Sequence, residues 1–277
     1  MRLNKKVLTI IFFVICVASY LAAQEASWNK VDDGLFIGTF ESHLKSIIGD
    51  SKIKIIRIDP NLYSFKLLCA GELKHSNLTA KEWSKKYNLI GVMNAGMFQT
   101  DYISNVGYMK NYNYINNSKI NSKYYSVVAF NPLDSTKSAN FHIFDIDNDN
   151  INSLIDRYYS IVQNLRLIKR PSLNRWSQQN KKWSEAALGQ DTNGNVLFIF
   201  SRSPYSMHDL INILKILPID IDCAQHLEGG PEASLYFSHK NIKIEMMGSY
   251  ETSFSENNDN NFYWKIPNVI GFIKNEQ

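Results

Sequence analysis

The sequence lacks an excess of charge of one sign. Its 30 basic and 26 acidic side chains give a formal charge of +4, too balanced for the concentrated basic surface on which nucleic-acid binding relies. It also lacks internal repeats and any linker rich in Pro and Ser between Lys52 and Lys274. We therefore expect no nucleic-acid partner, and we expect a single domain over residues 52–274 that follows a lead-in at residues 24–51.

An apolar run long enough to span a membrane comfortably, about 20 residues, is also missing. The run from Val7 to Ala18 is shorter, follows basic residues and is followed by small residues before Gln24. This layout is typical of a secretory signal, and an uncleaved anchor is the alternative. We expect cleavage after residue 23, export to the periplasm or the exterior, and no stable membrane anchor after cleavage.

Cysteine is scarce, with three residues in the whole chain. Cys16 lies in the expected signal, so the mature protein would keep Cys69 and Cys223 in a compartment where thiols can oxidise. The sequence does not give the distance between them. They either form one disulfide or remain as two buried thiols.

Apolar and β-branched runs predict strands, and two capping signals predict helices. Thr79, with Glu82 three residues later, forms a capping box for a helix that ends near Tyr87. Ser206 caps a second helix, which Pro218 ends. Strands are expected at residues 52–58, 63–69, 89–93, 124–130, 140–144, 186–190, 196–200 and 219–227.

Three connecting segments have features of their own. Asn193-Gly194 lies between two strands and predicts a tight hairpin turn. Residues 101–123 show no sustained period and predict a long surface loop. Residues 145–150 alternate aspartates as a calcium loop does, but they lack the central Gly and terminal Glu of an EF-hand. We interpret this last segment as a solvated turn and expect neither a metal nor a cofactor.

Polar clusters stand at predicted strand ends. The first contains Asn94, whose amide both donates and accepts, and Gly96, which permits a tight turn. The second combines Gln163 and Asn164 with two arginines, Arg170 and Arg202, whose planar guanidinium groups suit a phosphate. An ordinary turn and solvated surface arginines are the alternatives for these two clusters.

The third cluster begins at His226. In a regular strand His226 and Glu228 point to the same face, where an imidazole and a carboxylate can divide acid and base roles. Gly229 and Gly230 can expose backbone amides to an anion. The alternative is a surface ion pair that leads into a turn.

Taken together, these clusters resemble the bacterial branch of the phosphodiester glycosidase family over roughly residues 52–274. The segment Asn94–Phe98 is similar to the family element Asn-Gly-Gly-Phe-Phe, and Gln163-Asn164 to Gln-Asn-Gly-Pro. Residues 227–230 are similar to the family's Leu-Asp-Gly-Gly, with Glu228 in place of Asp. Glu232 falls where the family usually has Ser, and the nearest Ser is Ser234.

The resemblance implies an α+β domain, mainly an antiparallel sheet flanked by a few helices. It implies hydrolysis of a glycosyl phosphodiester or related envelope glycoside, with Glu228 as nucleophile, base or stabiliser of an oxocarbenium ion. His226 would carry protons, Asn94 would position substrate, and the two arginines would stabilise phosphate. The remaining substrate contacts implied are Gly96, Phe98, Gln163, Asn164, Gly229, Gly230, Glu232 and Ser234.

Two other functions remain open at this point. Glu228 and Glu232 depart from the family pattern, which favours a noncatalytic envelope protein that binds glycan or peptidoglycan in the same pocket. A hydrolase or lyase acting on a different envelope ester is the third possibility. A second carboxyl group near Glu228 would favour hydrolysis, and Glu232 and Asp191 are the candidates. The partner in the first two cases is a carbohydrate or a sugar phosphate.

Overall fold

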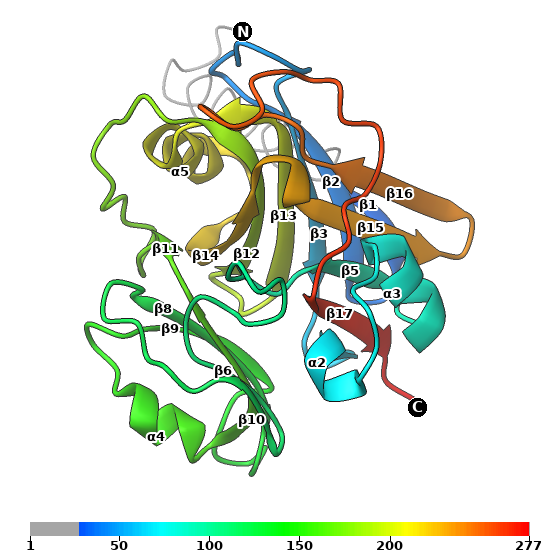
Figure 1. Ribbon diagram of the computed structural model, residues 1–277, viewed down its shortest axis with the longest axis vertical. Coiled ribbons are helices and arrows are strands. Elements are labelled where there is room, and N and C mark those ends of the chain that lie inside the picture. The colour runs from blue at the N-terminus through cyan, green and yellow to red at the C-terminus, as the bar shows by residue number, and fades with distance from the viewer. Residues whose placement is uncertain (1–27, 277) are drawn as a thin grey trace, which may run out of the picture.

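The largest sheet carries most of the candidate residues. The computed structural model describes residues 28–276, so the predicted signal lies outside the described residues. This sheet has seven strands in the order β1-β2-β3-β13-β12-β14-β11 (Figure 1). Their bounds are β1 (Trp28–Asp32), β2 (Leu35–Glu41), β3 (Lys52–Ile58), β11 (Arg166–Ile168), β12 (Trp183–Asp191), β13 (Val196–Tyr205) and β14 (Ile221–Gly229). Strands β1 and β2 come from the segment that we assigned to a lead-in, and β2 pairs with β3 along its whole length.

Two five-stranded sheets complete the fold. One has the order β7-β6-β10-β8-β9 and the other β16-β15-β5-β17-β4. The first contains β6 (Met109–Asn111), β7 (Tyr114–Asn117), β8 (Ser126–Pro132), β9 (Phe141–Asp145) and β10 (Tyr158–Asn164). The second contains β4 (Tyr63–Cys69), β5 (Gly91–Asn94), β15 (Ser234–His239), β16 (Ile242–Met247) and β17 (Asn268–Lys274). The described strand pairs are antiparallel.

Short helices cover the outer faces of these sheets. They are α2 (Ala70–Leu73), α3 (Ala80–Tyr87), α4 (Ile151–Ile155), α5 (Met207–Ile216) and the 3-10 turn η1 (Gly230–Glu232). Helix α5 buries Leu210, Ile211 and Leu214 against the large sheet, and α3 buries Trp83 against β5 and β15. Within residues 28–276 no helix is long and apolar enough to cross a membrane. The predicted α+β class with a mainly antiparallel architecture is confirmed.

The central core lies where the inner faces of the three sheets meet. It joins Phe198 of the large sheet, Phe130 and Phe141 of the second sheet, and Phe65 and Phe272 of the third. The ring of Phe65 touches those of Phe130, Phe141, Phe198 and Phe272, with centroids 4.7–6.4 Å apart. Because each sheet buries its inner face in the same apolar core, the strand ends are held at fixed relative positions.

The locally encoded predictions are confirmed. Thr79 accepts a hydrogen bond from the Glu82 amide at 3.2 Å, and the Glu82 carboxylate accepts one from the Thr79 amide at 2.8 Å, which completes the capping box of α3. Strands β12 and β13 form the expected hairpin around Gly194, whose φ is +87°. Such a φ is favourable for glycine and costly for other residues.

Other segments differ from, or decide between, the expectations. Residues 101–123 include the hairpin of β6 and β7, which short strands and weak alternation hid in the sequence. Cys69 and Cys223 are free, buried thiols, so the disulfide alternative is wrong. In the aspartate-rich turn, Asp145 and Asp147 both pair with Arg166, at 3.2 and 2.8 Å.

Candidate active site

Three strand ends meet at the turn that follows β14. Strand β14 ends at Gly229, β5 ends at Asn94 and β10 ends at Asn164, each in a different sheet. The turn continues through η1 into β15. Asn94, Asn164 and Glu228, one residue from each polar cluster of the sequence, therefore lie in three different sheets that share one core.

Asn94 fixes the backbone of the turn between β14 and β15. Its side chain, 1% exposed, donates to the carbonyl of Glu232 at 3.1 Å and accepts from the amide of Ser234 at 2.8 Å. The hydroxyl of Ser234 donates to the same Glu232 carbonyl at 3.1 Å. An amide suits this place because it satisfies one donor and one acceptor that would otherwise be buried without partners. The structure thus brings Asn94, Glu232 and Ser234 together.

Gly96 allows the β5 and β10 ends to come close. A Cβ atom at Gly96 would lie 2.6 Å from Oδ1 of Asn105 and 2.8 Å from Nδ2 of Asn164. The same Asn164 amide donates to the carbonyl of Leu227 at 3.4 Å. This chain of contacts joins the first, second and third clusters, and it requires glycine because no side chain fits in the remaining space.

A β-bulge at Leu227 changes the direction of the next side chain. His226 pairs with Ala187 and Glu228 pairs with Ala186, so Leu227 has no partner on β12. Ala186 and Ala187 belong to different core clusters on opposite faces of the sheet. His226 and Glu228 therefore point to opposite faces, and our expectation of a shared face is wrong, because the bulge inserts one residue into the alternation.

His226 is oriented by Glu185. Oε1 of Glu185 lies 2.6 Å from Nδ1 of His226, and its Oε2 accepts a hydrogen bond from the Trp183 indole at 2.6 Å. Glu185 and His226 are 2% and 3% exposed. A carboxylate only accepts, so Nδ1 of His226 is the donor in this contact.

Carboxyl groups surround the glycine turn. The backbone of Glu251 forms an isolated β-bridge with that of Trp183. Its side-chain Oε2 would lie 2.5 Å from a Cβ atom at Gly230. Burial and the neighbouring carboxyl groups of Glu232 and Glu251 raise the pKa of Glu228 well above its usual range. Burial also raises the pKa of Glu232 and of Glu251. The site therefore favours protonated carboxyl groups, most strongly at Glu228.

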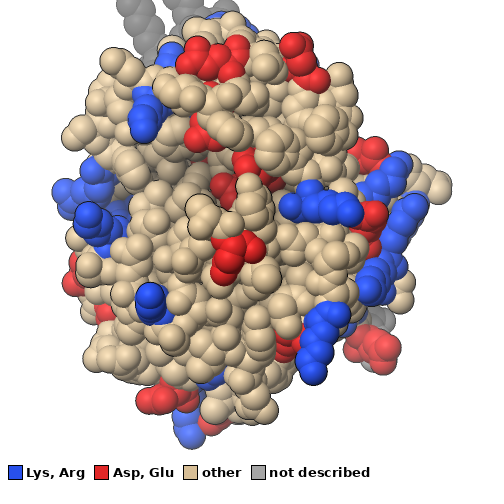
Figure 2. All heavy atoms as spheres, viewed as in Figure 1, with Lys and Arg blue, Asp and Glu red and all other residues tan. Residues whose placement is uncertain are grey.

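Charged side chains are unevenly distributed over the displayed face. Figure 2 shows acidic side chains in the middle of the face, whereas the larger groups of Lys and Arg lie at its edges.

The amide of Gly229 donates to Oε1 of Glu228 at 3.0 Å, so this glycine amide already has an acceptor. Within residues 28–276 no three His, Cys, Asp or Glu side chains are placed to hold one metal ion.

Gln163 and Phe98 organise the loop after β5. The Gln163 side chain accepts from the amides of Tyr108 and Asn121 at 3.1 and 2.9 Å and donates to the carbonyls of Asn121 and Tyr124. The backbone of Phe98 forms an isolated β-bridge with that of Asn105. These contacts are made within the protein, and they fix the loop over the β5 and β10 ends.

Arg202 donates hydrogen bonds to the segment that follows β16. Its guanidinium donates to the Met247 carbonyl at 2.7 Å, to the Asn258 side chain and carbonyl at 2.8 Å each, and to the Asn260 carbonyl at 3.0 Å. The Asn260 side chain in turn donates to the Gly248 carbonyl at 2.7 Å. Arg202 therefore anchors the segment after β16.

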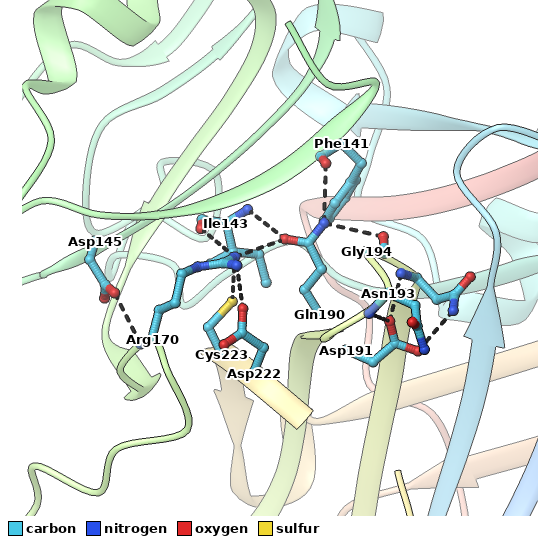
Figure 3. A network of polar contacts seen from close by, with 11 residues as sticks. Phe141, Ile143, Asp145, Arg170, Gln190, Asp191, Asn193, Gly194, Asp222 and Cys223 are labelled. Atoms are coloured by element: carbon cyan, nitrogen blue, oxygen red, sulfur yellow. Dashed lines mark hydrogen bonds and ion pairs between the residues drawn. The ribbon is translucent and has the colours of Figure 1, made fainter. Parts of the chain in front are cut away.

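Arg170 lies at the far end of β14 (Figure 3). Its guanidinium donates to Asp222, to Gln190 Oε1 at 3.1 Å and to Cys223 Sγ at 3.1 Å. Asp222 and Glu228 are six residues apart, roughly 20 Å along a strand. The structure therefore does not bring Arg170 to Glu228, contrary to our expectation that the two arginines gather with the acidic turn.

Asp191 is also remote, because it accepts from Asn193 and Asn195 within the hairpin turn at 2.8–2.9 Å. Of the two carboxyl candidates, Glu232 alone lies beside Glu228. Glu185 and Glu251 belong to the same cluster and were missed. Neither stands in a motif: Glu185 lies outside the predicted strand at residues 186–190, and Glu251 lies in a segment without periodic pattern.

Comparisons with known proteins identify the family and the fold. The sequence profile of the phosphodiester glycosidase family matches residues 87–273. A sequence comparison with curated proteins gave no match. A hypothetical protein from Synechocystis has a similar fold, with a TM-score of 0.63 and 11% identity over 90% of this chain and 63% of that protein. This chain thus spans less than two thirds of that protein.

The catalytic domain of zebrafish N-acetylglucosamine-1-phosphodiester alpha-N-acetylglucosaminidase, auto-inhibited by its pro-peptide, is also similar. The TM-score is 0.57 and the identity 14%, over 89% of this chain and 86% of the zebrafish domain. At 11% and 14% identity, the Synechocystis and zebrafish structures show that this chain shares their fold.

Proposed function

Because the chain belongs to the phosphodiester glycosidase family, we propose that it is an exported hydrolase of a glycosyl phosphodiester or related envelope glycoside. The observation that carries this proposal is the pair Glu228 and Glu232, two neighbouring carboxyl groups whose pKa values are raised to different extents. Glycoside hydrolysis commonly uses two carboxyl groups, one protonated and one ionised.

Glu228 is the proton donor in this proposal. Its pKa is raised the more strongly, so it keeps its proton when Glu232 has lost its own. Protonated Glu228 gives its proton to the glycosidic oxygen as the bond to the sugar breaks. Ionised Glu232 stabilises the positive charge that develops on the sugar, or attacks the anomeric carbon directly. Water then adds to the anomeric carbon, displacing Glu232 where that bond has formed, and gives its proton to the carboxylate of Glu228. This role for Glu228 differs from the carboxylate roles that the sequence suggested.

The residues around this pair act as positioning groups. Asn94 fixes the backbone of Glu232 through its two hydrogen bonds. Glu185 of β12 and His226 of β14 lie on the face of the large sheet opposite to Glu228, and their contact joins the two strands beside the bulge. These contacts keep the two carboxyl groups in fixed positions relative to each other.

Leaving-group dependence tests the role of Glu228. The purified protein is assayed with methyl glycosides, 4-nitrophenyl glycosides and glycosyl phosphodiesters of several sugars. Glu228→Gln should lower turnover by about 10² to 10³, and more for a methyl than for a 4-nitrophenyl leaving group, because the poorer leaving group depends more on proton donation. Exposed Glu256→Gln is the matched control.

Equal losses for both leaving groups would assign Glu228 to nucleophilic attack instead. Wild-type turnover in Glu228→Gln would remove it from the mechanism. Binding of glycosides without turnover by any form of the protein would favour the noncatalytic glycan-binding alternative.

Export is the second part of the proposal. The apolar run before Gln24 supports it. Expression with the native N-terminus should give a mature chain that begins near Gln24, as read by N-terminal sequencing. Intact Met1 in the membrane fraction would instead indicate a retained anchor.

A further inference from the structure

A cavity of about 440 Å³ lies between the outer edge of the third sheet and the strands of the second sheet. It follows the edge strand β4 from Ser64 to Leu68, and residues of β6, β8 and the turn after β6 bound its other side. Its lining consists of Ser64, Phe65, Lys66, Leu67, Leu68, Asn111, Tyr112, Asn131 and Ile273. None of these residues belongs to the candidate active site.

Tyr112 forms an aromatic wall of this cavity. Its ring stacks on that of Tyr159, with the centroids 4.9 Å apart and the planes at 18°, and its amide donates to the Tyr159 carbonyl at 2.8 Å. Tyr159 does not line the cavity, so it supports the Tyr112 ring from the other side. Tyr112 is 50% exposed. Its ring is thus held on one face and open on the other, as a platform for a ligand.

The backbone conformation of Tyr112 is unfavourable for a tyrosine. Tyr112 and Asn113 form the turn between β6 and β7, and φ of Tyr112 is +49°. Glycine and asparagine adopt this left-handed conformation readily, whereas bulky residues rarely do. Local stability alone would favour glycine at this position, so the aromatic ring here points to a role in binding.

Asn131 supplies a donor and an acceptor beside the ring. Its Nδ2 donates to the Ser160 hydroxyl at 2.9 Å, and this hydroxyl donates to Asn111 Oδ1 at 2.9 Å. Asn111 in turn donates to Glu72 at 2.8 Å. This chain of hydrogen bonds fixes the Asn131 side chain, whereas its Oδ1 and its second amide hydrogen have no partner among residues 28–276.

The ring and the amide together match the chemistry of a sugar. A sugar ring has C–H groups that pack on the electron-rich face of an aromatic ring, and its hydroxyl groups both donate and accept. Lys66 is the only charged residue in the lining, so no cluster of charges selects a strongly charged ligand. Lys66 also stands in the middle of edge strand β4, where a lysine disfavours the addition of a further strand. A glycan therefore fits this cavity better than an extended peptide does.

We propose that this cavity is a second carbohydrate site, in which Tyr112 stacks on one sugar of a neutral glycan and Asn131 hydrogen-bonds the sugar hydroxyl groups. It is separate from the candidate active site, because Tyr159 and Asn164 are five residues apart along β10, roughly 17 Å. Binding here requires no hydrolysis at Glu228, so the site goes beyond the proposed function.

Glycine substitutions test the site without straining the backbone. Tyr112→Gly and Asn131→Gly remove side chains at positions whose φ values, +49° and +56°, suit glycine. Both variants should therefore keep their melting temperatures close to that of the wild type. Calorimetry on the purified full chain measures binding of oligosaccharides of N-acetylglucosamine, glucose and mannose, and cosedimentation measures binding to peptidoglycan sacculi. For at least one probe, we expect the affinity to fall about tenfold in Tyr112→Gly and about threefold in Asn131→Gly.

Two further variants are the controls. Tyr112→Phe keeps the ring and should retain the affinity. Tyr125→Ala removes a tyrosine that is similarly exposed, at 45%, but lies outside the cavity, and it should leave the affinity unchanged. Should Tyr112→Gly fail to fold, Asn131→Gly decides the question by the same comparison.

Three outcomes would overturn the proposal. The first is equal affinity of the wild type and Tyr112→Gly for every probe, which includes the case in which no glycan binds. The second is an equal loss in Tyr112→Gly and Tyr125→Ala. The third is binding of a Val-Thr repeat peptide without binding of any glycan, which would assign the cavity to strand addition along β4.

Discussion

Glu185 Oε1 lies 2.6 Å from Nδ1 of His226, in a contact that joins adjacent strands of the large sheet beside the bulge. The second oxygen of the same carboxylate accepts the Trp183 indole proton at 2.6 Å. Both carboxylate oxygens are thus satisfied by donors on one face of the sheet. The buried Glu185 charge is stabilised by these two contacts, which makes the residue sensitive to substitution.

Substitution of Glu185 by Gln should destabilise the protein by about 2 kcal/mol. The amide group of Gln offers one acceptor oxygen where the carboxylate offers two, so its NH2 group would face either the Trp183 indole, which only donates, or His226, whose proton would have to move to Nε2. Trp183→Phe removes one of the two donors, so the double variant should be more stable than the sum of the single losses predicts. Denaturant unfolding of the four proteins measures this coupling, and strict additivity would show that the two contacts are independent.

Glu228→Gln should change how stability depends on pH. Because the native pKa of Glu228 is raised, the native state holds this proton at pH values where the unfolded state, with a pKa of about 4.3, has lost it. The wild type therefore loses stability relative to the Gln variant as pH rises above about 4. Melting temperatures of both proteins between pH 4 and 8 measure the difference.

The same series on Glu232→Gln provides the comparison. The pKa of Glu232 is raised less than that of Glu228, so its pH-dependent difference should be smaller. A melting-temperature difference for Glu228→Gln that stays constant across this range would show that its carboxyl group titrates normally in the folded protein.

Asn94→Ala should lower both stability and turnover. It leaves the Ser234 amide without an acceptor and removes one donor from the Glu232 carbonyl, at a cost of about 2 kcal/mol. Asn94→Asp keeps an acceptor for the Ser234 amide but cannot donate to the Glu232 carbonyl when ionised. Turnover that follows the order wild type, Asp, Ala would support a positioning role, whereas full activity of the Ala variant would exclude one.

Arg170→Met should destabilise the fold without affecting substrate affinity. The substitution leaves the largely buried Asp222 without its ion pair and removes the donor to Gln190, at a cost of about 2 kcal/mol after allowance for the partial exposure of Arg170. Arg175→Met, at an exposed position, is the control and should leave stability unchanged. If KM for a phosphodiester rose at least tenfold while stability stayed constant, Arg170 would have the phosphate-binding role that the sequence suggested.

The sequence by itself determined the features that depend on neighbouring residues. The capping box of Thr79 and Glu82, the hairpin at Asn193-Gly194 and the strand at residues 52–58 follow from interactions within a few positions. It also indicated that Asn94, Gly96, Asn164 and Glu228 belong to one family pattern. Contacts between the strand ends explain why these residues lie together.

Only the tertiary structure decided which polar groups face one another. The bulge at Leu227 depends on pairing between β12 and β14, and it reverses the face of Glu228. Arg202 has its acceptors more than 40 positions away along the chain, at Met247 and Asn258, and so no local pattern reveals that it is occupied. Glu185 and Glu251 join the acidic turn through β-sheet pairing, because hydrogen-bonded strands bring side chains together regardless of their separation in sequence.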